Sequence, residues 1–103
     1  MPQEKISAEE ARKRLADVDS SLIFWLAGGG TLKSLSELSA VLPGMSNEVF
    51  SQHVNAEKND FASWIRDVIH DEKLASKVRK STSKSAIAKA VASRLSELKK
   101  SSQ

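Results

Sequence analysis

Apolar residues repeat with helical spacing in the middle of the chain, between His53 and Ala75. Five of them stand at positions i, i+3, i+4, i+7 and i+8, which place side chains on one face of a helix: Phe61, Trp64, Ile65, Val68 and Ile69. Asn59 is a favourable N-cap residue, and Asp60 adds negative charge to the first turn, where the helix dipole stabilises it. The pattern predicts a central helix from Asn59 to His70, with its apolar face at the centre of the fold.

Shorter amphipathic segments lie on both sides of this helix, each preceded by a residue that can cap a helix. Two of the capping serines are followed three positions later by glutamate, which completes a capping box. The candidate caps are Ser7, Ser34, Ser46, Asn59, Asp71 and Ser83 or Ser85. The predicted helices cover residues 8–16, 35–42, 47–54, 60–70, 72–80 and 84–98.

Residues 22–27 (LIFWLA) are apolar on both sides and precede three glycines, Gly28 to Gly30. The run is too short for periodicity to distinguish a buried strand from a helical turn. Its aromatic content and the glycines favour a strand that closes a small hairpin with residues 31–33. The expected fold class is therefore mainly α: a small bundle of five or six short helices, with a minor β-hairpin near residues 22–33.

A polar, serine-rich and basic stretch, residues 80–85 (KSTSKS), is the best candidate for a linker. It divides the chain into a helical core domain over residues 7–80 and a basic C-terminal helix over residues 81–98. The ends, residues 1–6 and 99–103, are predicted to be disordered. A chain of 103 residues has room for one modest core.

Charge is distributed unevenly along the chain. Residues 1–72 carry seven Lys or Arg and twelve Asp or Glu, whereas residues 73–103 carry nine Lys or Arg and a single acidic residue, Glu97. The net charge of +3 thus conceals a segment of −5 and a segment of +8. This polarity indicates an anionic partner for the C-terminal part or docking of that part on the acidic body. A solvated basic helix that binds nothing is the equally weighted alternative.

The candidate anion-binding residues are cations of this basic segment. Lys73, Lys77 and Lys80 share one helical face, so they can form a patch that binds phosphates without sequence preference. The patch lacks nearby aromatic residues for base stacking, which favours duplex over single-stranded nucleic acid. The predicted nucleic-acid-binding set is Lys73, Lys77, Arg79, Lys80, Lys84, Lys89 and Arg94.

Residues 34–54 (SLSELSAVLPGMSNEVFSQHV) resemble a helix-turn-helix, in which the second helix would present Asn47, Ser51 and Gln52 to base edges. Two features oppose this reading. The turn is one residue longer than usual, and the second helix contains Glu48 but no Lys or Arg. Phosphate affinity would have to come from the basic segment.

The last helix offers a different kind of contact. Its aliphatic side chains form a narrow stripe that can dock on this chain or pair with another one: Ile87, Val91, Leu95 and Leu98. Trp25 is a further candidate anchor for a partner, whereas Trp64 is expected in the core. The second functional hypothesis is therefore a protein–protein adaptor or homodimerisation domain with no role in nucleic-acid binding.

Signals of catalysis, metal or cofactor binding are weak. The absence of cysteine excludes disulfides and thiolate chemistry. The glycines before Lys33-Ser34 do not have the spacing of a phosphate-binding Walker motif, so a turn is favoured. His53 and His70 lack the spacing of a known metal site. Local hydrogen bonds are favoured instead, from His53 to Asn59 or Asp60, and from His70 to Asp67.

Several short motifs occur together over residues 22–80. Residues 24–38 read FWLAGGGTLKSLSEL, and F-x-x-H-V, N-D-F-x-x-W-I-R-D-V and D-x-x-L-A follow at 50–54, 59–68 and 71–75. In this order they resemble an uncharacterised domain-of-unknown-function family that occurs mostly in archaea and in some bacteria. The resemblance supports the boundary of the domain and implies no activity. Members of such families usually have a shorter turn in place of the three glycines.

The sequence thus predicts a small non-enzymatic binding module without metal or cofactor. Its basic C-terminal segment is expected to engage nucleic acid, with duplex DNA favoured and little sequence preference. No apolar run approaches the roughly 18 residues of a membrane helix, and the N-terminus lacks a signal-peptide core. We therefore expect a soluble, cytoplasmic protein with no membrane partner and no small-molecule substrate.

Overall fold

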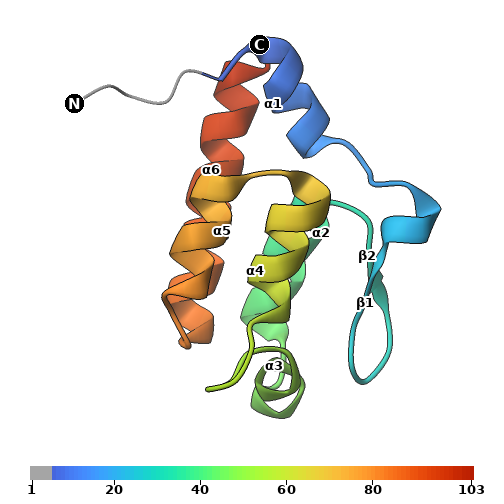
Figure 1. Cartoon of the computed structure of the whole chain (residues 1–103), viewed down its shortest axis with the longest axis vertical. Helices are drawn as coiled ribbons and strands as arrows, with labels where there is room; N and C mark the ends of the chain where they lie inside the picture. Colours follow the sequence, from blue (N-terminus) through green and yellow to red (C-terminus); the bar gives the residue numbers. More distant parts are fainter. Residues whose placement is uncertain (1–5) are drawn as a thin grey trace.

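The computed structural model describes residues 6–103 and confirms a mainly helical fold with a small hairpin (Figure 1). Of the predicted disordered segment 1–6, only Ile6 is among the described residues, and it packs against the core. The helices are α1 (Ala8–Leu15), α2 (Leu35–Val41), α3 (Asn47–His53), α4 (Asp60–Trp64), α5 (Glu72–Arg79) and α6 (Lys84–Ser101). Single helical turns of 3-10 type cover Ser20–Leu22 and Leu42–Gly44.

Side-chain caps start all six of these helices, as the sequence predicts. In each case the cap accepts a hydrogen bond from the backbone N–H three residues further along: Ser7, Ser34, Ser46, Asn59, Asp71 and Ser83. Five of the helices have eight residues or fewer. Helices of that length are unstable in isolation, so they depend on the apolar surface that they bury together.

The hairpin consists of β1 (Phe24–Trp25) and β2 (Thr31–Leu32), which pair antiparallel with Phe24 opposite Leu32. Gly28, Gly29 and Gly30 connect the strands with φ angles of 84°, 108° and 101°. These are backbone conformations that only glycine adopts readily, which explains the run of three glycines. The hairpin points Phe24 into the core and leaves Trp25 74% exposed.

The central helix begins as predicted but does not stay regular. After α4 the backbone forms one π-helical turn, Ile65–Ile69. This helical segment ends at His70, which adopts a left-handed conformation with φ of 65°. Phe61, Trp64, Ile65 and Ile69 are buried, but Val68 is only half-buried. The prediction of a fully buried stripe therefore needs correction at Val68, which packs against the edge of the core, while the other four residues of the stripe are buried.

The last helix belongs to the same core as the rest of the chain. α6 packs against α1, α2 and α5, and it lies behind α5 in Figure 1. The connection before it is shorter than the predicted linker, because α6 begins at Lys84. The predicted disordered tail 99–103 also needs correction: α6 continues to Ser101, and the Arg12 side chain donates a hydrogen bond to the Ser102 carbonyl.

Candidate functional site

The outward face of α5 and its C-cap carry three exposed lysines: Lys73 and Lys77 within the helix, and Lys80 at the C-cap. The opposite side of α5 is buried through Leu74, Ala75 and Val78, so the i, i+4, i+7 spacing directs the three lysines to solvent. Among residues 6–103, no carboxylate lies within ion-pair distance of any of them. We call these three residues the α5 lysine face. Its positive charge is uncompensated, and its members lie within about 10 Å along the helix.

A buried ion pair anchors the start of α5. The fully buried Asp71 carboxylate accepts hydrogen bonds from the Leu74 backbone at 3.1 Å and from Arg94 Nε and Nη2 at 2.7 and 3.1 Å. Arg14 Nη1 lies 3.6 Å from the same carboxylate. Asp71 thus caps α5 and also ties it to α6 and α1, which holds the α5 lysine face in a fixed orientation.

Arg94 needs correction as a nucleic-acid-binding residue. Its side chain is 5% exposed and is occupied by Asp71, so it does not reach the surface. The sequence contained a signal for this: Arg94 lies at the same helical spacing as the buried Ile87, Val91 and Leu98. A charged residue within an apolar stripe is expected to have a buried partner, whereas a count of charges treats it as solvated.

The other predicted cations fall into two groups. Arg79 and Lys89 are exposed, on α5 and α6 respectively. Lys84 is half-buried, and its ammonium donates a hydrogen bond to the Met45 carbonyl, so it secures the start of α6. The predicted basic segment is therefore not one surface: the α5 lysine face is the part that shares one helical face, and Arg79 lines a pocket at the end of the same helix.

The predicted partner-binding stripe on α6 also needs correction. Ile87, Val91 and Leu98 have no exposed surface, and Leu95 is 9% exposed. The same side chains would suit a second chain, but α1, α2 and α5 of this chain already cover them. Pairing through this stripe would require the core to open.

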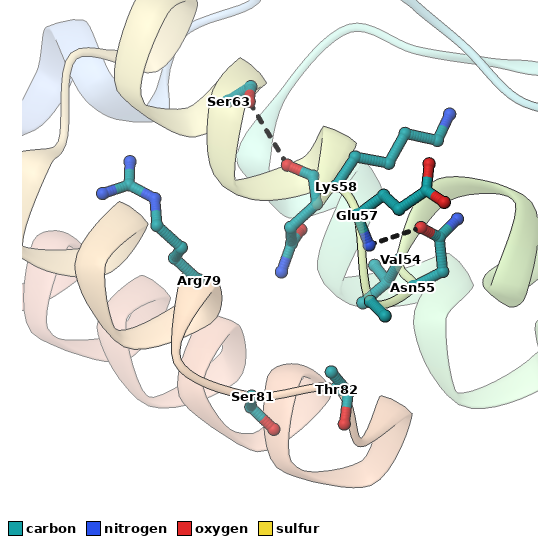
Figure 2. Close-up of a pocket in the computed structure, with 10 residues that line it drawn as sticks. Val54, Asn55, Glu57, Lys58, Ser63, Arg79, Ser81 and Thr82 are labelled. Atoms are coloured by element: carbon teal, nitrogen blue, oxygen red, sulfur yellow. Dashed lines mark hydrogen bonds between the residues drawn. The ribbon is translucent and has the colours of Figure 1, made fainter.

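A polar pocket of about 320 Å³ lies at the end of α5, between residues 54–59 and residues 79–82 (Figure 2). Several of its polar groups already have hydrogen-bond partners within the fold. Asn59 accepts from the Ala62 backbone and donates to the Val78 carbonyl, and the Ser63 hydroxyl donates to the Asn59 carbonyl.

The groups that remain for a ligand in this pocket are few. The side chains of Arg79 and Thr82 line it and make no hydrogen bond or ion pair with any other described residue, and in Figure 2 the Arg79 side chain extends away from the 55–58 turn. Hydrogen bonds from Arg66 lower the pKa of the nearby Asp67 carboxyl, and the charges of His70 and Arg79 contribute further. The predicted Asp67–His70 pair is replaced by Asp67–Arg66, at 2.8 Å.

His53 makes one of the two bonds that the sequence suggests. Its Nδ1 lies 3.0 Å from the Asp60 carboxylate. Its other ring nitrogen, Nε2, accepts a hydrogen bond from the Ala27 backbone N–H at 3.0 Å, which the sequence does not indicate. Since both nitrogens are occupied and the residue is 7% exposed, His53 connects three segments of the fold.

Comparison with protein-family models, with curated proteins and with solved structures finds no match to this chain. The resemblance over residues 22–80 therefore stays a prediction. Within residues 6–103, no helix is long and apolar enough to cross a membrane. In the same part of the chain, no three His, Asp or Glu side chains gather as a metal site would require.

Proposed function

We propose that this domain binds an anionic polymer, most favourably duplex DNA, through the α5 lysine face and Arg79. The observation that carries the proposal is the group of three exposed lysines on one helical face without acidic partners among residues 6–103. Duplex DNA carries one phosphate charge per about 1.7 Å of its axis, so a face about 10 Å long meets several phosphates. The buried Asp71–Arg94 pair keeps these cations in place before binding.

The surroundings of the α5 lysine face favour contact with phosphates over base reading. The hairpin with Trp25, the exposed aromatic side chain of residues 6–103, lies on the opposite side of the view in Figure 1 from α5. Stacking on bases beside the lysines is therefore not supported. On α3, the exposed Asn47, Ser51 and Gln52 stand next to Glu48, which repels phosphates. We infer little sequence preference.

The test is a titration of duplex DNA binding against salt. If the α5 lysine face and Arg79 each replace one counterion, the logarithm of the binding constant falls against the logarithm of salt concentration with a slope of about −3 to −4. Duplexes of unrelated sequence should give the same slope. Binding that does not respond to salt, or no binding in about 50 mM salt, would refute the proposal.

Self-association is a second candidate function, favoured by the exposure of Trp25 (74%) and Leu22 (47%). Large aromatic side chains exposed on a surface are typical anchors of protein interfaces. We expect sedimentation velocity to show a dimer at high protein concentration that the Trp25→Ser variant does not form. A monomer mass at every concentration contradicts this function.

A further inference from the structure

Protonation of His53 changes which segment of the fold the imidazole can hold. Nε2 receives a hydrogen bond from the Ala27 backbone N–H, which can only donate. Nε2 must therefore carry a lone pair, and the proton of the neutral ring must lie on Nδ1, where it is donated to Asp60. The structure thus assigns both the tautomer and the charge state of the ring from its two partners.

We propose that His53 is a pH-sensitive latch of the hairpin: when the ring takes up a second proton, it keeps Asp60 and releases Ala27. A protonated Nε2 is a donor, so it would face the Ala27 N–H donor at 3.0 Å and the bond could not persist. The Nδ1–H bond to the Asp60 carboxylate is strengthened by the new positive charge. One segment is therefore released while the other is held more firmly.

The released segment is the tip of the hairpin. Ala27 directly precedes Gly28, Gly29 and Gly30, and few bonds hold this loop: the Leu26 N–H donates to the Gly30 carbonyl, and the Gly29 N–H donates to the Leu26 carbonyl. Both of those bonds lie within the hairpin. The Ala27–His53 bond connects the loop to α3, so its loss loosens the loop, and with it the strand end that bears the exposed Trp25.

Among the described residues, Asp60 is the charged group that bonds to the His53 ring, so the exchange of hydrogen-bond partners depends on protonation of the ring itself. Asp60 contacts the ring directly, and Lys58 reaches the same carboxylate at 3.0 Å. On the other elements that pack here the ring meets Phe24 of β1 and Phe61 of α4, with ring centroids 5.0 and 5.2 Å away. The remaining charged residue of α3, Glu48, and the residue after β2, Lys33, are exposed.

The Asp60 carboxylate takes up a proton only at acidic pH, outside the range of the proposed latch. Burial raises the pKa of Asp60, but the hydrogen bonds from His53 and Lys58 outweigh burial, and the pKa is lowered from its usual value. Its contribution to stability is therefore present above the ordinary Asp pKa of about 3.9 and is lost as pH falls through the lowered value. An effect seen between about pH 5 and 8 belongs to a histidine.

The experiment is an NMR titration of the ¹⁵N-labelled protein between about pH 8 and 5, which follows the Ala27 amide and the His53 ring. We expect the Ala27 amide to shift together with protonation of His53, and its protection against hydrogen exchange to fall by roughly five- to hundredfold. The hydrogen bonds of Leu26 and Gly29 should change less. The wild-type titration alone decides the outcome, so the test does not depend on any variant folding.

Two variants test whether the pH dependence of the Ala27 amide comes from His53. His53→Gln should abolish the pH dependence of the Ala27 amide, whereas His70→Asn, at the exposed left-handed position, should keep it. The latch is refuted if the Ala27 amide is unchanged while His53 protonates, or if its pH dependence survives in His53→Gln. It is refuted equally if His53 stays neutral down to the pH at which the domain unfolds.

Discussion

Asp71→Asn is expected to lower the free energy of unfolding by about 3 kcal/mol. The amide has the shape of the carboxylate and can still cap α5 by accepting from the Leu74 N–H. It leaves the buried Arg94 guanidinium without its anionic partner, and an uncompensated buried charge is among the most costly single changes a core can suffer. Since domains of this size have about 5–15 kcal/mol in total, much of the stability would be lost.

Urea unfolding followed by circular dichroism measures this loss, with an expected fall of the midpoint by about 1–3 M. Asp67→Asn is the matched control, because Asp67 pairs with Arg66 at 2.8 Å but is exposed. Solvent replaces that interaction, so no resolvable change in midpoint is expected. Asp71→Leu combined with Arg94→Met should recover part of the loss, because it removes the buried Asp71–Arg94 pair but also the cap of α5 and the carboxylate beside Arg14. Equal midpoints for Asp71→Asn and Asp67→Asn would show that the pair does not anchor α5.

The parts of the fold that could be predicted depend on interactions within four residues of one another. Each helix start was predictable, because a cap bonds to the N–H three positions later, as Asn59 does with Ala62. The hairpin was favoured because three successive glycines suit a turn with positive φ angles, although periodicity did not distinguish a strand from a helical turn at residues 22–27. Local chemistry determines both features, and the sequence displays it directly.

The parts that could not be predicted depend on contacts far apart in the chain. Asp71 shows the cap signal, but its pairing with Arg94 joins residues 23 positions apart. The aliphatic stripe on α6 fits another chain as well as this one, and only the packing of α1, α2 and α5 assigns it to the core. The π-helical turn at Ile65–Ile69 has no sequence signal that periodicity detects, because the pattern there fits an ordinary helix.

The same distinction applies to the candidate site. The spacing of Lys73, Lys77 and Lys80 was enough to place them on one face, and all three are exposed. The sum of charges over residues 73–103 gave no information on which cations reach solvent, and it therefore included Arg94 and Lys84. Burial separates these two from the α5 lysine face, and the proposed interface is smaller than the +8 charge suggests.

Replacing Lys73, Lys77 and Lys80 together by glutamine is expected to weaken duplex DNA binding by roughly 500-fold at about 0.1 M salt. Each lysine that contacts a phosphate contributes about 0.9 to the salt slope, so the slope should become less steep by about 2.7. All three side chains are exposed and make no ion pair within residues 6–103, so the circular dichroism spectrum and the urea midpoint should not change.

The matched control replaces Lys13, Lys33 and Lys99 by glutamine, which removes the same charge from exposed positions outside α5. Because these residues lie on α1, after β2 and near the end of α6, the control should keep the salt slope and lose less than about tenfold in affinity. Equal losses in the two triple variants would mean that overall charge attracts DNA and that α5 has no special part. A preserved slope in the α5 variant would place the phosphate contacts elsewhere on the domain.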